Sequence, residues 1–132
     1  MPPVNINTGA ADPRFDRPIF IVNPPRSGSS LLFETLAQAP DLYTVGGESH
    51  GVIEGVRGLG ILAANFDSNC LDETHARPEI IAQLRQRFND LLRNRDGAPA
   101  PAGRVRMLEK TPKNALRIPF LAKVFPEARF IY

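Results

Sequence analysis

A short segment of the sequence places an arginine, a glycine and several hydroxyl groups side by side. It reads Pro24-Pro25-Arg26-Ser27-Gly28-Ser29-Ser30. A glycine lets the backbone turn close to a ligand, and hydroxyls together with the free N–H groups of a helix N-terminus donate hydrogen bonds to an anion. Arg26 adds a permanent positive charge of a shape that suits phosphate. The segment predicts an anion cradle; the alternative is a helix cap after a proline turn.

The spacing within this cradle differs from that of two well-known nucleotide-binding loops. The sequence has no Gly-x-x-x-x-Gly-Lys-Ser/Thr motif, and the segment lacks the Gly-x-Gly-x-x-Gly of dinucleotide-binding folds. The predicted cradle therefore matches neither of these two loops.

Alternating strands and helices must position the cradle. Apolar runs predict strands over residues 19–22, 42–45, 105–108 and 128–132. Helical spacing of apolar residues predicts helices from Ser29 or Ser30 to about residue 40, from Pro78 to Leu92, and over 119–125. Residues 51–78 predict loop and irregular helix, with a short helix near 59–64, and residues 96–103 predict a surface linker. The alternation predicts an α/β fold with a mostly parallel sheet.

Three polar segments follow the carboxyl ends of the predicted strands, which is where ligands bind in parallel sheets. They are Pro24–Ser30, Gly46–His50 and Glu109–Asn114. We therefore expect Glu48 and Lys110 to lie near the cradle.

The last predicted strand coincides with the end of the sequence. We expect residues 1–17 to form a flexible leader and residues 18–132 to form an incomplete domain, truncated after its fourth strand. An exposed strand edge of this kind invites pairing with another chain. We therefore expect self-association, and no activity from the isolated chain.

The composition argues against several classes of protein. The chain has 132 residues and a single cysteine, Cys70, which excludes a disulfide scaffold and a cysteine zinc cluster. A net charge of +2 is too small for a nucleic-acid-binding stripe. Of the 16 cationic residues, 13 are arginines, whose side chains suit planar anions such as phosphate and carboxylate. Because no apolar run exceeds four residues and residues 1–16 lack an apolar core, we expect no membrane span, no signal peptide and a cytoplasmic protein.

The segment Pro25-Arg26-Ser27-Gly28-Ser29-Ser30-Leu31-Leu32 resembles the 5′-phosphosulfate loop of sulfotransferases that use 3′-phosphoadenosine 5′-phosphosulfate (PAPS). It is similar to the bacterial and tyrosylprotein branch, which carries an arginine at the second position. Gly47-Glu48 resembles the Gly-Glu after the first helix of that branch. Glu109-Lys110-Thr111-Pro112-Lys113 resembles the segment before the helix that leads to its 3′-phosphate strand. The resemblance implies a P-loop-like three-layer sandwich.

The same resemblance implies transfer of a sulfuryl group from PAPS to a hydroxyl or amine of a small-molecule, peptide or carbohydrate acceptor. It implies that the donor is bound by Pro25, Arg26, Ser27, Gly28, Ser29 and Ser30. Catalytic roles fall to Arg26 and Lys110, which stabilise negative charge, and to Glu48 as general base. His50 competes with Glu48, because an imidazole titrates near neutrality. The family pattern has no metal site, and we expect none here.

Two further expectations concern the segment around Lys110. Glu109 is expected to pair with an arginine, and Lys113 to be solvated. The 3′-phosphate clamp of the family, an arginine and a serine after the fourth strand, has no counterpart in the sequence.

Two other functions stay open at this point. A P-loop-like kinase would need a magnesium-binding acidic residue at a strand end and a lysine in the loop, and neither is evident in the sequence. The second alternative is a fragment that binds anions without catalysis.

Overall fold

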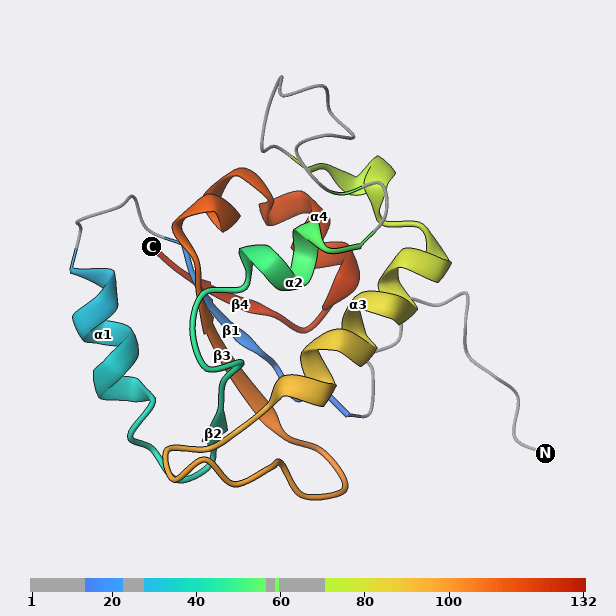
Figure 1. The fold of residues 1–132 in the computed structure, drawn as a ribbon. Helices are drawn as coiled ribbons and strands as arrows, with labels where there is room; N and C mark the ends of the chain where they lie inside the picture. The colour runs from blue at the N-terminus through green and yellow to red at the C-terminus, as the bar shows by residue number, and fades with distance from the viewer. Residues whose placement is uncertain (1–13, 23–27, 57–58, 60–70) are drawn as a thin grey trace.

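A parallel sheet lies at the centre of the computed structural model (Figure 1). The structure describes residues 14–22, 28–56, 59 and 71–132. Within these residues the strands are β1 (Ile19–Ile21), β2 (Leu42–Tyr43), β3 (Arg106–Lys110) and β4 (Arg129–Ile131). Their order in the sheet is β2-β3-β1-β4, and each pairing is parallel. The predicted α/β fold with a parallel sheet is confirmed.

Helices connect the strands and cover the sheet. They are α1 (Ser29–Leu36), α2 (His50–Glu54), α3 (Pro78–Leu91) and α4 (Ile118–Val124), with 3-10 turns η2 (Glu73–His75) and η3 (Pro112–Leu116). In Figure 1, α2, α3 and α4 lie together, whereas α1 stands apart from them and contacts β3. None of the described helices is long and apolar enough to cross a membrane.

The hydrophobic core lies between the sheet and the group of α2, α3 and α4. Phe20 of β1 and Met107 of β3 belong to it and are fully buried. On α3, Ile80, Leu84 and Phe88 recur every four residues and bury one face of the helix. Each buried side chain of this size stabilises the fold by about 1.5–3 kcal/mol. The helix predicted from Pro78 is confirmed, and it ends at Leu91.

Side chains alternate between the two faces of β3, and this alternation determines where its last residues point. Met107 and Glu109 share the face toward the core. Leu108 and Lys110 share the opposite face, on the side of α1. The strand therefore ends with a carboxylate on one face of the sheet and an ammonium group on the other.

The bounds of several elements differ from the prediction. β3 continues past residue 108 to Lys110, because its last residues pair with β1 up to Ile21. Within residues 51–78, predicted as loop and irregular helix, the structure has most of α2 and the 3-10 turn η2. Phe15, assigned to the leader, is buried in the core and forms a bridge with Val105. Residues 1–13 of that leader, and residues 60–64 of the predicted short helix, lie outside the described residues.

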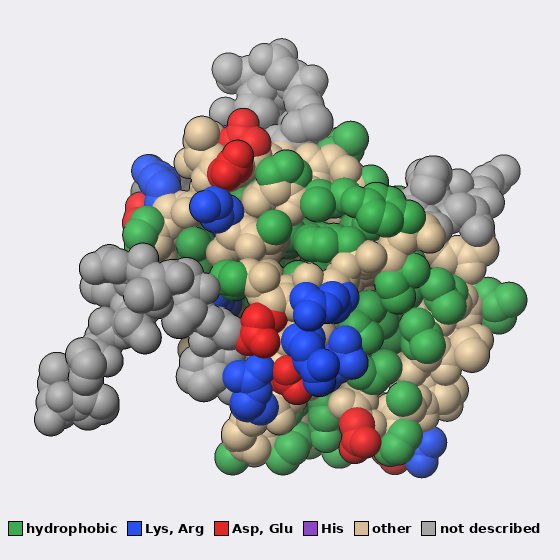
Figure 2. Space-filling model, turned by 180° about the vertical axis from the view of Figure 1, so that it is seen from behind, with side chains coloured by type: hydrophobic (Ala, Val, Ile, Leu, Met, Phe, Trp, Pro, Cys, Tyr) green, Lys and Arg blue, Asp and Glu red, His purple; other side chains and the backbone are tan. Residues whose placement is uncertain are grey.

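The predicted serine cap of α1 was wrong. No serine caps the helix with its side chain, and the residue before the helix is Gly28. Leu31 and Leu32 have the spacing of apolar helix positions, yet they are 71% and 37% exposed, because α1 lies apart from the other helices. Apolar side chains cover a broad area of the molecule seen from behind, next to a cluster of Lys and Arg side chains (Figure 2). Exposed apolar surface favours association between chains. Self-association of this chain stays a prediction.

Candidate active site

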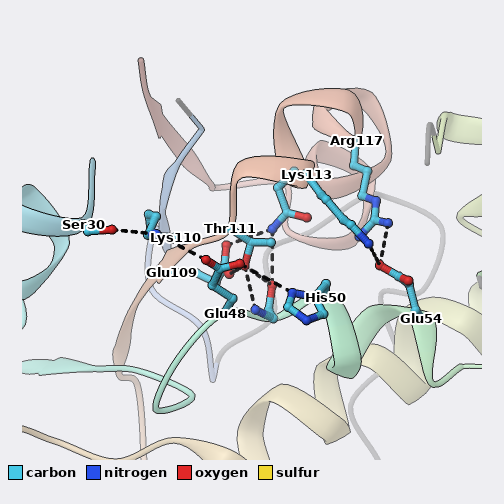
Figure 3. A network of polar contacts seen from close by, with 11 residues as sticks. Ser30, Glu48, His50, Glu54, Glu109, Lys110, Thr111, Lys113 and Arg117 are labelled. Carbon is cyan, nitrogen blue, oxygen red and sulfur yellow. Dashed lines mark hydrogen bonds and ion pairs between the residues drawn. The ribbon is translucent and has the colours of Figure 1, made fainter. Parts of the chain in front are cut away.

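Polar side chains from three segments meet at the carboxyl end of β3, around Lys110. Its Nζ donates a hydrogen bond to Ser30 Oγ of α1 at 3.1 Å and lies 3.4 Å from Glu48 Oε1 (Figure 3). The Lys110 side chain is only 10% exposed. Glu48 reaches this point because it follows β2, which pairs with β3. The structure thus brings together Ser30, Glu48 and Lys110, three of the residues selected from the sequence.

The Glu48 carboxylate lies between a lysine and a histidine. Oε1 faces Lys110, and Oε2 lies 3.5 Å from Nδ1 of His50, the first residue of α2. The Glu48 and His50 side chains are 41% and 50% exposed, so an acceptor molecule can approach either group from solvent. A carboxylate in this setting can take a proton from an attacking hydroxyl.

The structure describes the cradle from Gly28 onward. Gly28 has a φ of 87°, a left-handed conformation that side chains disfavour, and it directly precedes α1. A Cβ at Gly28 would meet no atom within 4 Å, so backbone conformation rather than space favours glycine here. The first N–H groups of α1 lack partners within the helix and can donate to an anion. Pro25, Arg26 and Ser27 lie outside the described residues.

Glu109 lies on the other face of β3 and is fully buried. Its carboxylate accepts hydrogen bonds from the Thr111 hydroxyl and, at 2.9 Å, from Asn114 Nδ2. Burial raises the pKa of Glu109, although hydrogen bonds from Ser49, Thr111 and Asn114 oppose that effect. Among the described residues the partners of Glu109 are neutral donors, so the expected arginine partner is not found there.

A second charged cluster joins α2 to the segment around η3. Glu54 Oε2 accepts hydrogen bonds from Arg117 Nη2 at 3.0 Å and from Lys113 Nζ at 3.3 Å (Figure 3). Burial acts to raise the pKa of Glu54, but the bonds from Arg117 and Lys113 outweigh it and hold the pKa below its usual value. Lys113, expected to be solvated, is thus half-buried in an ion pair.

Sequence reasoning missed several residues of these two clusters, namely Ser49, Glu54, Asn114 and Arg117. One signal was available for Asn114, which stands in the polar run after the third predicted strand. Arg117 carried none, because an arginine ahead of an apolar helix is usually exposed. The described part of the chain holds no group of three or more His, Cys, Asp or Glu side chains that could bind a metal ion.

Comparisons with known proteins identify a family for the chain. The sequence model of the Sulfotransferase family matches residues 18–132, a range that includes every residue of the site. No curated protein and no solved structure matches the chain.

Proposed function

The chain belongs to the Sulfotransferase family, and on that premise we propose that it transfers the sulfuryl group of PAPS to an acceptor hydroxyl or amine. Family membership supports sulfuryl transfer in general. The nucleotide donor, the class of acceptor and the role of each residue are parts of the proposal.

The position of Lys110 is the observation that carries this proposal. One ammonium group contacts both Ser30 of the cradle helix and the Glu48 carboxylate. A reaction that moves a group from a bound nucleotide to an acceptor needs a cation at the leaving group and a base at the acceptor. Here the buried Lys110 ammonium group is the cation, and the Glu48 carboxylate beside it is the base.

In the proposed reaction the acceptor oxygen or nitrogen attacks the sulfur atom and gives its proton to Glu48. The bond between sulfur and the bridging oxygen breaks, and its electron pair stays on the 5′-phosphate of adenosine 3′,5′-bisphosphate. Negative charge grows on that phosphate and on the sulfuryl oxygens. Lys110 and Arg26, with the donors at Gly28, Ser29 and Ser30, stabilise this charge, as in phosphoryl transfer.

An NMR titration with adenosine 3′,5′-bisphosphate tests the choice of donor, because it detects dissociation constants up to the millimolar range. The expected result is a shift of the backbone amide signals of residues 28–31. Lys110→Met and Arg26→Ala should each weaken binding at least tenfold, since a hydrogen bond to a charged group contributes about 1.5–3 kcal/mol.

Lys123→Met serves as the matched control, because Lys123 is exposed on α4. It removes one positive charge without touching the site and should leave binding unchanged. The donor assignment would be refuted if millimolar bisphosphate moved no cradle signal, or if Lys123→Met weakened binding as much as Lys110→Met.

A further inference from the structure

A closed ring of hydrogen bonds lies behind the site, and the proposed reaction does not use it. Asn114 Nδ2 donates to Glu109 Oε2 at 2.9 Å and to Ser49 Oγ at 3.3 Å. The Ser49 and Thr111 hydroxyl oxygens are 3.2 Å apart, and the Thr111 hydroxyl donates to Glu109 Oε1 (Figure 3). All four residues are fully buried. Water therefore does not compete for these bonds.

The ring ties the loop after β2 to the end of β3 through the backbone of Ser49. The Ser49 N–H donates to Thr111 Oγ1 at 2.6 Å. Thr111 thus accepts from Ser49 with its oxygen and donates its hydroxyl proton to Glu109. Glu109 fixes the direction of that hydroxyl, and so keeps a lone pair of Thr111 aimed at the Ser49 amide.

Each end of this hydrogen bond stands one residue beyond a member of the site. Ser49 follows Glu48, and Thr111 follows Lys110. Because a peptide unit is planar and rigid, holding the Ser49 nitrogen also holds the Cα atom of Glu48. At the other end the acceptor is the Thr111 side chain, whose Cα atom belongs to the peptide unit that links Thr111 to Lys110. The ring therefore sets the separation of the two backbone positions from which Glu48 and Lys110 approach to 3.4 Å.

We infer that Glu109 and Thr111 are positioning residues, which hold the Glu48 carboxylate opposite the Lys110 ammonium group. The inference rests on the proposed roles of Glu48 and Lys110 in sulfuryl transfer. A buried carboxylate is unfavourable unless donors surround it, and an apolar side chain could fill the same space. The carboxylate provides what an apolar side chain lacks, namely two acceptors that orient the Thr111 hydroxyl and the Asn114 amide together.

The first test measures the geometry of the site without relying on catalysis. Thr111→Val keeps the shape of the side chain and removes the acceptor of the Ser49 amide. Lys110 acylation by acetic anhydride is followed by mass spectrometry, with the exposed Lys123 as internal reference. The acylation rate of Lys110 relative to that of Lys123 should rise about fivefold. This factor corresponds to the loss of one hydrogen bond of about 1 kcal/mol.

Two matched variants accompany this measurement. Thr111→Ser restores the hydroxyl and should reverse most of the effect. Thr44→Val removes a different threonine acceptor, in the loop after β2 that also holds Ser49, since Thr44 Oγ1 accepts the Gly46 N–H at 3.1 Å, and it should leave the rate at Lys110 unchanged. An unchanged rate in Thr111→Val, or an equal rise in Thr44→Val, would overturn the inference. If Thr111→Val does not fold, Glu109→Gln replaces it with the same expected direction.

The second test separates positioning from donor binding. In a form of the protein that transfers the sulfuryl group, Thr111→Val should lower kcat by about 10- to 100-fold, since a displacement near 1 Å can cost about 100-fold, while the KM for PAPS changes less than about threefold. A KM that rises as kcat falls would overturn a positioning role. Glu48→Gln is measured in the same assay, and an unchanged kcat in that variant would contradict the role of Glu48 as base. The acylation experiment tests the positioning role of the ring independently of that outcome.

Discussion

Replacing Glu54 by alanine is expected to destabilise the fold by about 2 kcal/mol at neutral pH. Glu54 is a carboxylate partner of Arg117, whose side chain is only 1% exposed, and of Lys113. Removing one member of a buried ion pair costs about 3–5 kcal/mol, because the other charge stays in a setting of low polarity. We expect a smaller effect because Glu54 is 20% exposed and Lys113 is 36% exposed, so that water screens part of the interaction.

Urea unfolding followed by circular dichroism measures this change, and the chain offers a matched control. Glu79 pairs with Arg77 at 3.4 Å, but both side chains are about two-thirds exposed, at 67% and 65%. Glu79→Ala should therefore change the free energy of unfolding by less than about 0.5 kcal/mol. Equal costs for Glu54→Ala and Glu79→Ala would refute the reasoning from burial.

The pH dependence of the same variant gives an independent check. The pKa of Glu54 is held below its usual value of 4.5, so the ion pairs stabilise the fold above that pH. The contribution is lost as the pH falls through the lowered pKa of the folded protein. The difference in stability between the wild type and Glu54→Ala should therefore shrink in acid. A difference that stays constant down to about pH 3 would contradict the assigned ion pairs.

Three other predictions concern the site. In a form of the protein that transfers the sulfuryl group, Glu48→Gln should lower that activity by about 100-fold or more with nucleotide affinity nearly intact, and His50→Asn should have a smaller effect; the opposite ranking would exchange the two roles. Gly28→Ala should destabilise the protein by about 1–2 kcal/mol, because φ at this position is left-handed; unchanged urea unfolding would argue against that conformation. Burial raises the pKa of Glu109 above 4.5, so its favourable contribution is present below that value and is lost as pH rises through the folded pKa. The stability of the wild type relative to Glu109→Gln should therefore fall with rising pH, and a flat difference would contradict the raised pKa.

Strong local signals made the strands and the longest helix predictable. The β-branched and aromatic run from Ile19 to Val22 requires burial on both faces of a sheet, and β1 is found there. Pro78 followed by apolar residues at helical spacing is sufficient to define α3. These signals lie within a few residues of one another, so they do not depend on the rest of the fold.

Features that depend on distant parts of the chain were not predictable in this way. Leu31 and Leu32 have the spacing of a buried helix face, yet they are exposed because α1 stands apart from the core helices. The order β2-β3-β1-β4 also leaves no local trace in the sequence. The proximity of Glu48 and Lys110 was expected because parallel strands bring their carboxyl ends to one edge, a rule that holds whatever the strand order.

The surroundings of Glu109 and Lys110 could not be predicted from local sequence patterns. The two residues are adjacent, both are charged at neutral pH in water, and both close the same strand. Because successive side chains of a strand point to opposite faces of the sheet, Glu109 and Lys110 lie in different environments although they are neighbours in the sequence. Segments more than fifty residues away contribute to both faces: Ser30 and Glu48 contact Lys110, and Ser49 adds to the nearby donors Thr111 and Asn114 around Glu109. Because Ser49 is bonded to Glu48, we expect the face of the strand that carries Glu109 to constrain the face that carries Lys110. A carboxylate without contact to the proposed reacting groups would then govern their separation.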